Sequence, residues 1–467
     1  MTYPIDSSLY DVVIIGGGAS GTSLLYTLAQ YTNIARIALL EKYDRPGQVN
    51  SKATNNSQTL HVGDIETNYT LEKVRQVKPA AMMVARYAEQ LPAEERAKIL
   101  FPTQKMVIGV GAEEVATLEK RYTDLKELFP DLQKLSRADI AAVEPKVVEG
   151  RSELEPIIAL CTKQGYGVDF ECLSQSFVDR ATQAKSDVSV RFNSQVDSII
   201  FNADKTYTLK IKDGSELRTK VLVVNADSYS LLLAKQLGYG QQFSLIPIAG
   251  TFYFSKQLLN GKVYTVQEPR LPFAAVHGDP DVRVPNATRW GPTARFHPVL
   301  ESRNFKTSLD YLRSSGLGNF QTWVSFIKIL LDPVRFTYLI KNMLYELPWI
   351  GTQLFVHNVQ KIVPTLRAKD IQTAKGYGGM RLQRVDTKTH ELQLGEGKII
   401  GEKSIFNMTP SPGASVCLYN AMRDAEKVIG FLEQRYTFEE ERMKAELFTA
   451  KEATVLPAVS LPEGYAS

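Results

Sequence analysis

The chain contains little cysteine and little histidine. Its 467 residues include three cysteines and five histidines. Cys161, Cys172 and Cys417 do not have the C-x-x-C spacing of a metal site. An odd number of scattered cysteines favours a reduced cytoplasmic protein over a disulfide framework. No group of residues has metal-ligand spacing, so we expect no metal.

Long apolar runs, internal repeats and a strong charge imbalance are also missing. No stretch of about 18 apolar residues could span a bilayer, and residues 1–6 do not resemble a signal peptide. The net charge of +4 is compatible with anionic substrates or an anionic membrane surface, but it is too small to indicate nucleic acid. A chain with 44% hydrophobic residues can bury more than one core. We therefore expect a soluble or peripheral protein.

Residues 11–41 carry the most informative pattern. They read as a strand, the run Gly-Gly-Gly-Ala-Ser-Gly, an apolar helical stretch and a second strand ending at Glu41. Gly16, Gly18 and Gly21 have the G-x-G-x-x-G spacing, which allows a tight turn, the approach of a pyrophosphate and close packing of helix on strand. Phosphates would lie at the helix N-terminus, where unpaired N–H groups favour negative charge. The pattern predicts a dinucleotide site rather than the glycine turn of another α/β protein.

The acid at the end of the second strand narrows the choice of dinucleotide. A carboxylate at Glu41 can accept the two ribose hydroxyls and disfavours a 2′-phosphate. The pattern therefore favours FAD or NAD over NADP.

Hydrophobic periodicity predicts the remaining elements. We expect helices at 72–89, 93–99, 112–128 and 414–433, a long helical and aromatic stretch at 309–347, and strands at 104–110, 188–192, 196–201, 207–212, 221–225, within 245–266 and at 404–407. The fold class is α/β (α+β), with a Rossmann-like dinucleotide-binding domain and a second domain of mixed β-sheet and helices. We expect the first domain to be discontinuous, formed by 1–80, 160–235 and 370–435, and the substrate or cap domain to contain 81–159 and 236–369. The tail, 436–467, is charged and then rich in Ala, Pro and Ser, so we expect it to pack loosely.

Four further segments, with the glycine-rich fingerprint, resemble malate:quinone oxidoreductases. They contain Asn-Ser-Gln-Thr-Leu-His, Pro-Phe-Ala-Ala-Val-His-Gly-Asp-Pro-Asp and Phe-Asn-Met-Thr-Pro-Ser-Pro-Gly-Ala, and they lie within 56–70, 221–234, 273–294 and 376–421. The chain is more distantly similar to L-2-hydroxyglutarate dehydrogenases and to the D-amino-acid oxidase class of flavoproteins. The resemblance implies FAD as cofactor, oxidation of (S)-malate to oxaloacetate, and ubiquinone or menaquinone as electron acceptor. It also implies peripheral attachment to the inner face of the cell membrane, linking the tricarboxylic acid cycle to the respiratory chain.

Two other functions stay open at this point. The chain could oxidise another 2-hydroxy acid, such as L-2-hydroxyglutarate, or it could be a flavin-binding scaffold without turnover.

Histidine is suited to take the hydroxyl proton when an alcohol is oxidised, because its ordinary pKa is close to neutral pH. His277 follows a short apolar run, and we favour it as this base; the alternative is a turn histidine bonded to Asp279 or Asp281. His61 lies in a polar loop that, by resemblance, runs along the flavin, so it is a second candidate for the active site. The remaining histidines read as surface residues.

Arg381 is the candidate for binding a substrate carboxylate. It lies in Gly-Gly-Met-Arg-Leu-Gln, and a guanidinium group holds a carboxylate in bidentate fashion. By resemblance Gln383 also contacts the substrate. The alternative for Arg381 is that it is an exposed surface arginine. A dicarboxylate needs a second group, for which Arg295, Lys105 and Tyr253 are unranked candidates.

Several further residues should contact the cofactor. The segment before the last helix could hold the negatively charged edge of a reduced flavin. By resemblance, Val196 should reach the adenine, and the strand ending at Asn225 should lie beside the pyrophosphate, with Asp227 in a position where a glycine is usual. The predicted cofactor contacts are Gly16, Gly18, Ser20, Gly21, Glu41, Lys42, Ser57, Gln58, Val196, Asn225, Ala226, Gly413, Ala414 and Ser415.

Residues 320–350 interleave aromatic with basic side chains. Phe320, Trp323 and Phe326 belong to this run, as do Lys328 and other basic residues. Such a stretch suits an interfacial helix that touches a bilayer or a quinone. The alternative is an ordinary core stripe.

Overall fold

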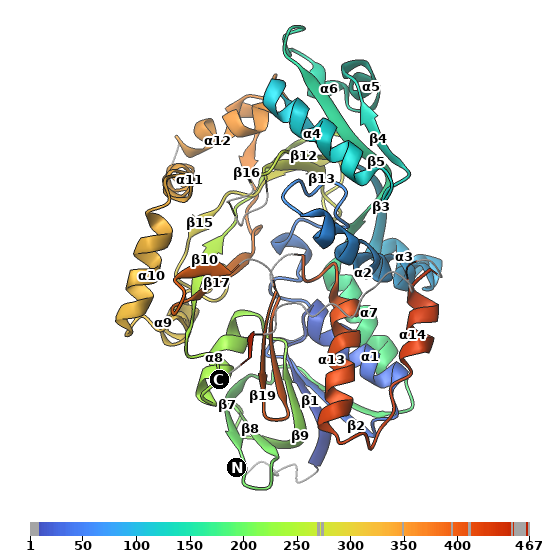
Figure 1. The fold of residues 1–467 in the computed structure, drawn as a ribbon, viewed down its shortest axis with the longest axis vertical. Coiled ribbons are helices and arrows are strands. Elements are labelled where there is room, and N and C mark those ends of the chain that lie inside the picture. Colours follow the sequence, from blue (N-terminus) through green and yellow to red (C-terminus); the bar gives the residue numbers. More distant parts are fainter. Residues whose placement is uncertain are drawn as a thin grey trace.

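The computed structural model describes residues 9–268, 271, 275–347, 350–393, 396–409, 412–449, 452 and 464–465. In this part of the chain three β-sheets are arranged along the long axis of the molecule (Figure 1). A sheet of nine strands lies at one end and a sheet of eight at the other. The third sheet, of four strands, lies beside the junction of these two. The predicted mixture of an α/β unit and a second sheet-and-helix unit is confirmed, whereas the domain boundaries stay a prediction.

The nine-stranded sheet is built around parallel strands, and its order is β21-β19-β20-β9-β1-β2-β6 with the β7–β8 hairpin beside β9. Val12 and Ile14 are fully buried, as expected for a strand covered on both faces. Since Ile15 pairs in register with Val224, the chain segments that follow β1 and β9 emerge at the same sheet edge. The strands are β1 (Leu9–Ile15), β2 (Arg36–Leu40), β6 (Asp187–Arg191), β7 (Val196–Phe201), β8 (Tyr207–Ile211), β9 (Glu216–Val224), β19 (Gly397–Gly401), β20 (Ser404–Met408) and β21 (Gly464–Tyr465).

The other two sheets are built mainly from antiparallel strand pairs. The four-stranded sheet has the order β15-β10-β17-β18 and contains β10 (Phe243–Ala249), β15 (Arg295–Phe296), β17 (Met380–Asp386) and β18 (Glu391–Gln393). The eight-stranded sheet has the order β16-β11-β14-β13-β12-β3-β5-β4. Its strands are β3 (Leu100–Val110), β4 (Leu132–Leu135), β5 (Ile157–Val168), β11 (Tyr253–Lys256), β12 (Lys262–Thr265), β13 (His277–Pro280), β14 (Ala287–Gly291) and β16 (Gln372–Thr373).

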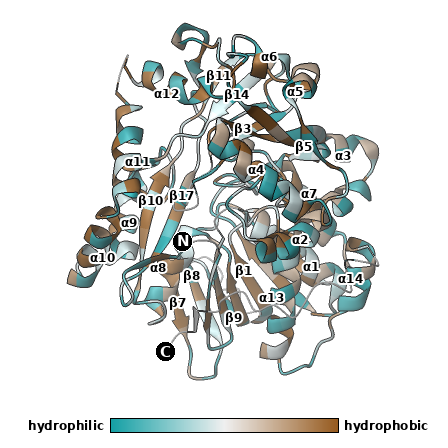
Figure 2. Cartoon of the chain, turned by 45° about the horizontal axis from the view of Figure 1, so that its top comes forward, coloured by the Kyte–Doolittle hydropathy of each residue, from teal (hydrophilic) through white to brown (hydrophobic). Residues whose placement is uncertain are grey.

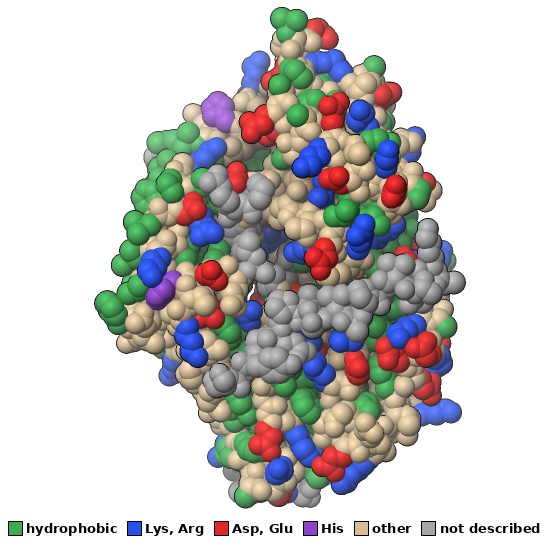
Figure 3. Space-filling model, viewed as in Figure 1, with side chains coloured by type: hydrophobic (Ala, Val, Ile, Leu, Met, Phe, Trp, Pro, Cys, Tyr) green, Lys and Arg blue, Asp and Glu red, His purple; other side chains and the backbone are tan. Residues whose placement is uncertain are grey.

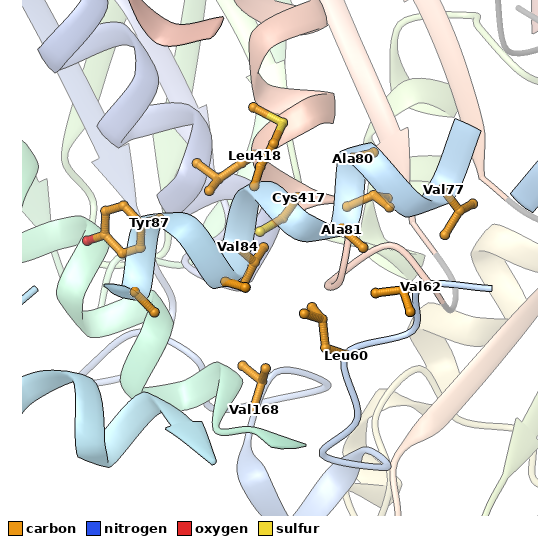
Figure 4. Packing of buried hydrophobic residues seen from close by; sticks show 14 of the residues in the cluster. Leu60, Val62, Val77, Ala80, Ala81, Val84, Tyr87, Val168, Cys417 and Leu418 are labelled. Atoms are coloured by element: carbon orange, nitrogen blue, oxygen red, sulfur yellow. The ribbon is translucent and has the colours of Figure 1, made fainter. Parts of the chain in front are cut away.

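The helices cover the sheets and join them. In the close-up, α2 lies between the first turn of α13 and the loop that carries Leu60 and Val62 (Figure 4). Helices α1 and α13, which cover the nine-stranded sheet, therefore share one apolar core with the eight-stranded sheet. Helix α1 packs between α7 and α13. The helices are α1 (Ala19–Tyr31), α2 (Leu71–Glu89), α3 (Ala93–Ile99), α4 (Ala112–Leu125), α5 (Arg137–Val143), α6 (Pro145–Val148), α7 (Phe170–Thr182), α8 (Ser228–Gln236), α9 (Ser308–Ser315), α10 (Phe320–Leu330), α11 (Pro333–Leu344), α12 (Gly351–Gln360), α13 (Cys417–Phe431) and α14 (Glu440–Leu447).

Two expectations from the sequence need correction. The stretch 309–347 is not one helix, because Gly316, in a left-handed conformation, ends α9 and Pro333 opens α11. The expectation of a loosely packed tail is wrong for 436–449, since α14 packs against α2 and buries Met443 and Leu447 completely. No helix in the described part of the chain is both long and apolar enough to cross a lipid bilayer.

Candidate active site

A large cavity runs from the loop between β1 and α1 to strand β17. Its lining includes Gly16 to Ser20 at the start of α1, Val196 at one end, and His61 and Arg381 at the other. The nine-stranded and the four-stranded sheet therefore both contribute to a single site, which is lined by segments far apart in the sequence.

The three glycines of the fingerprint have different reasons for being glycine. A Cβ atom on Gly16, whose φ is +107°, would lie 2.4 Å from the carbonyl oxygen of Asn225, and one on Gly21 would lie 1.9 Å from the carbonyl oxygen of Gly16. A Cβ atom on Gly18 would meet nothing closer than Ser51 Oγ at 3.2 Å. Gly16 and Gly21 are therefore required by the fold, whereas the lack of a side chain at Gly18 keeps the cavity open.

Glu41 points back at the glycine loop. The N–H of Gly17 donates to its Oε2 at 2.6 Å and the N–H of Tyr43 to its Oε1 at 2.9 Å, while burial raises the pKa of this carboxyl group above its ordinary value. Lys42 pairs with Glu301 and lies 4.0 Å from the centroid of the Tyr229 ring; burial lowers the pKa of its ammonium group to about 8. Both side chains line the cavity.

Asp227 also lines the cavity, just after β9. Its φ of +49° belongs to the region that favours glycine, which is the residue expected there from the resemblance. Burial raises the pKa of its carboxyl group to about 6, and Asn50 Nδ2 donates to it at 2.7 Å. The substitution keeps the backbone conformation and adds a carboxyl group beside the cofactor cavity.

The cavity fits the FAD suggested by the sequence. Gly18 gives the N-terminus of α1 no side-chain cap, and its first turn has no acidic residue. The N–H of Ala19 donates to Ser51 Oγ at 2.9 Å, whereas among the described residues the N–H of Ser20 has no such partner and is available to a phosphate. Val196 lines the end where an adenine would lie, and Ala414 and Ser415, just before α13, line the cavity too. Of the predicted cofactor contacts, Gly16, Gly18, Ser20, Glu41, Lys42, Ser57, Val196, Asn225, Ala226, Ala414 and Ser415 line the cavity.

His61 faces the cavity and is held by two partners. Its Nδ1 lies 2.5 Å from Glu66 Oε1 and its Nε2 lies 3.0 Å from Ser57 Oγ. The other carboxylate oxygen of Glu66 accepts the N–H of Gly63 at 2.8 Å. Burial would raise the pKa of Glu66, but the hydrogen bond and charge of His61 outweigh it and lower this pKa below its ordinary value. An ionised Glu66 fixes a proton on Nδ1, which leaves Nε2 free to accept one.

Arg381, on β17, lies in the wall of the same cavity. Within the described part of the chain its guanidinium group forms no hydrogen bond and no ion pair. Burial lowers its pKa, and the nearby phenols of Tyr338, Tyr264 and Tyr69 oppose that shift. A desolvated cation without an acidic partner is suited to bind an anionic ligand.

His277 lies outside the lining of this cavity. Its ring is fully buried and stacks on Tyr264, with 4.3 Å between the ring centroids. Its Nδ1 lies 3.1 Å from the carbonyl oxygen of Ala275, whereas its Nε2 has no hydrogen-bond partner among the described residues and lies 3.7 Å from Asp279 Oδ1. Burial lowers the pKa of the imidazole to about 3. Neither His277 nor Tyr264 is in the cavity lining, so the base favoured from the sequence does not face the space in which a substrate could lie.

Other predicted residues are structural. Gln58, fully buried, bonds to Ala53 and Asp281, and neither it nor Gln383 is in the cavity lining. Gly413 is not in the lining either. The fold requires glycine there, because a Cβ atom would lie 2.6 Å from the carbonyl oxygen of Thr409.

The candidates for the second carboxylate are engaged elsewhere. Lys105 is paired with Asp64 at 2.9 Å and Arg295 with Glu346 at 2.8 Å. Tyr253 stacks in a separate core. The cavity lining contains none of these three, so this part of the sequence prediction is not supported by their positions.

Sequence reasoning missed four residues near the site. Glu66 follows His61 by five positions in the same loop, a spacing that could have suggested the pair. Tyr69, Tyr264 and Tyr338, which surround Arg381, come from three distant segments, and no local pattern indicates that they converge.

Comparison with solved structures identifies the class of the fold. The chain is similar to a dithionite-reduced L-α-glycerophosphate oxidase from Mycoplasma pneumoniae with FAD bound, with a TM-score of 0.62 and 17% identity, covering 91% of this chain and 95% of that one. It is also similar to glycine oxidase from Geobacillus kaustophilus, with a TM-score of 0.62 and 16% identity, covering 97% and 100%. Together with the family match given next, the fold, the glycine loop and its cavity define an FAD-dependent oxidoreductase.

Sequence comparison identifies the family. The model of malate:quinone oxidoreductases matches residues 8–456. A probable malate:quinone oxidoreductase of Campylobacter jejuni is 43% identical over 94% of this chain and 99% of its own length, and that of Helicobacter pylori strain J99 is 42% identical over 92% and 96%. The chain belongs to the malate:quinone oxidoreductase family.

Proposed function

We propose that this protein oxidises (S)-malate to oxaloacetate and delivers the electrons to a membrane quinone, ubiquinone or menaquinone, at the inner face of the cell membrane. In that position it would connect the tricarboxylic acid cycle to the respiratory chain. The family match supports malate and quinone as substrates. The observation that carries the proposal is the unpaired guanidinium group of Arg381 in the same cavity as the His61–Glu66 pair.

Arg381 binds one carboxylate of malate in bidentate fashion. Its position on a strand of the four-stranded sheet limits its freedom, and its burial strengthens the interaction with an anion. The phenols of Tyr69, Tyr264 and Tyr338 lie near Arg381 but outside the cavity lining, and the hydroxyl group of Tyr264 is bonded to Thr59 at 2.8 Å, so they are not assigned to the second carboxylate.

His61 takes the hydroxyl proton of malate through Nε2. The hydroxyl of Ser57, which lies 3.0 Å from this nitrogen, occupies the position in which a substrate hydroxyl would bind. Glu66 holds the ring and stabilises the imidazolium ion that forms. We therefore prefer His61 over His277, whose ring is outside the cavity lining and whose lowered pKa makes it a weak base.

FAD would be held by the N-terminus of α1, by Glu41 at the ribose and by the segment before α13. When bound, it would accept the hydride from C2 of malate.

Replacing each histidine by asparagine distinguishes the two bases. His61→Asn should lower malate-dependent reduction of a soluble dye roughly 10²–10⁴-fold at unchanged flavin content, the usual contribution of a general base. His277→Asn should change the rate per bound flavin by less than about tenfold. A severe loss in His277→Asn with a mild one in His61→Asn would return the role to His277. Faster dye reduction with 2-hydroxyglutarate than with malate would contradict the proposed substrate.

A further inference from the structure

Helix α10 buries polar side chains and exposes large apolar ones, the reverse of an ordinary surface helix. The side chains that it buries include Thr322 and Ser325, whose hydroxyl groups donate to carbonyl oxygens of the chain. On its outer face Phe320, Trp323 and Ile327 are 75%, 50% and 56% exposed. In water such a helix leaves its apolar face without a partner.

Helix α11 likewise buries a polar side chain and exposes apolar ones. Its buried residue is Asn342, which accepts the N–H of Ala294 at 2.7 Å. Phe336, Ile340 and Met343 are 50%, 41% and 53% exposed on the outer side.

These side chains form one continuous feature, which we call the apolar ridge: the exposed hydrophobic side chains between Phe305 and Ile350. Fourteen of the seventeen large hydrophobic side chains that are exposed in the described part of the chain belong to it. Hydrophobic side chains gather along the left edge of Figure 3, where Figure 1 shows α10 and α11, and hydrophobic segments occur along these two helices in Figure 2. The other three, Leu154, Ile200 and Phe296, lie outside this segment of the chain.

The charges on the ridge are mainly basic. Lys306, Arg313, Lys328 and Lys341 are exposed on the same helices or beside them. The acidic residues are largely engaged: Asp332 caps the N-terminus of α11, and Glu346 pairs with Arg295. A surface that combines exposed apolar and cationic side chains is complementary to a bilayer with anionic headgroups.

We propose that the apolar ridge is the surface by which this protein docks on an anionic lipid bilayer, with α10 and α11 lying in the plane of the interface. A bilayer accounts for the apolar side chains and the basic ones together. A symmetric contact between two copies of the chain would instead bring the basic groups of the two ridges towards each other.

The ridge is also directly connected to the active-site cavity. Asn342 holds Ala294, which lines a small cavity together with Arg381, and Tyr338 of α11 is one of the phenols near Arg381. A single helix therefore separates the lipid-facing side chains from the substrate site. This part of the inference rests on the proposed function, because it gives a lipid-dissolved quinone a short way to the flavin.

The test uses the flavin-loaded full-length protein and vesicles of phosphatidylglycerol and phosphatidylcholine, compared with phosphatidylcholine alone. Phe320→Ser with Ile327→Ser should weaken vesicle binding about tenfold or more, because two apolar side chains are lost from the contact. Lys328→Glu with Lys341→Glu should weaken binding to the anionic vesicles at least about fivefold per residue. High salt should release part of the wild-type protein.

Matched controls remove comparable groups from other faces. Leu154→Ser with Ile200→Ser removes two exposed apolar side chains, and Lys98→Glu with Lys120→Glu reverses two exposed charges. These variants should bind vesicles like the wild type. All variants should keep malate-dependent dye reduction in solution, since the substituted side chains point away from the cavity.

Two outcomes would overturn the proposal: wild-type binding retained by the ridge variants, or no vesicle binding by an active wild-type protein. A wild-type dimer that the ridge variants dissociate, without any change in vesicle binding, would instead assign the ridge to contact between copies. Failure of the proposed function gives a different result, because the wild-type protein would then bind vesicles without reducing dye in the presence of malate.

Discussion

At the scale of single residues, the site is defined by groups whose hydrogen-bonding capacity the fold leaves unused. Arg381 has no acidic partner among the described residues, and Nε2 of His61 is contacted by a hydroxyl group that a substrate can replace. Lys105, by contrast, is buried and neutralised by Asp64. Arg381 is distinguished by lying, unpaired among the described residues, in the lining of the large cavity.

Arg381→Lys tests this assignment. Lysine keeps the charge but loses the planar fork, so malate binding should weaken about 10- to 150-fold, the equivalent of roughly 1.5–3 kcal/mol. Discrimination against hydroxy acids with one carboxylate should weaken as well. The measurement is the KM for malate in the dye assay.

Arg384→Lys is the matched control, because Arg384 lies on the same strand and packs over the ring of Phe243 outside the lining of the large cavity. It should leave the KM for malate unchanged. An unaltered KM in Arg381→Lys would exclude Arg381 as the carboxylate site.

At the scale of elements, the glycine loop between β1 and α1 has to fold correctly and also to leave space for a pyrophosphate. A substitution at Gly18 can separate these two requirements. Gly18→Val should leave the backbone intact, because φ at Gly18 is −76° and a Cβ atom there has space, yet it should place a branched side chain where a pyrophosphate has to lie. We expect flavin content after desalting to fall to near zero while the circular dichroism spectrum stays that of the wild type.

Gly16→Val is the contrasting variant, since its clash with Asn225 should destabilise the fold itself. Full flavin retention by a folded Gly18→Val protein would mean that the phosphates bind elsewhere.

At the scale of the whole molecule, a buried charge cluster connects the eight-stranded sheet to the loop beside the cavity. Asp279 pairs with Lys262 at 2.8 Å and with Arg289 at 3.0 Å. Arg289 donates to the carbonyl oxygen of Asn56 and Lys262 to that of Ser57. His277 is enclosed in the same cluster as a neutral imidazole.

This enclosure makes stability depend on pH. The folded-state pKa of His277, about 3, lies below the ordinary value of 6.5, so the unfolded chain binds the proton first as the pH falls. The stabilisation is complete above the unfolded pKa and is lost progressively between about pH 6.5 and 3. When the pH is lowered from 7 to 5, protonation of His277 in the unfolded chain should decrease the unfolding free energy by about 2 kcal/mol.

His277→Phe removes the titrating group and keeps a ring against Tyr264. Between pH 7 and pH 5, the unfolding free energy of this variant, measured by denaturant titration, should fall by about 2 kcal/mol less than that of the wild type. Equal acid destabilisation of both proteins would show that His277 is not neutral in the fold.

The sequence determined those parts of the protein that depend on neighbouring residues. The glycine loop, Glu41 and the strand and helix around them are specified by local spacing, because a turn, a helix N-terminus and a strand end lie within one contiguous segment. Helix α3 (Ala93–Ile99) and strand β7 (Val196–Phe201) begin and end where their periodicity predicts. The family could also be identified from short motifs alone.

Only the tertiary structure decided which chemical groups meet and which faces stay exposed. The pairing of His61 with Glu66, the three phenols around Arg381 and the enclosure of His277 depend on how distant segments pack. The aromatic stretch could have been core or surface from its composition, because hydrophobic periodicity shows that a helix has an apolar face but does not show what covers that face. The fold buries Thr322, Ser325 and Asn342 of α10 and α11, with Ile329, and leaves most of the large apolar side chains of these helices exposed; packing alone determines that choice.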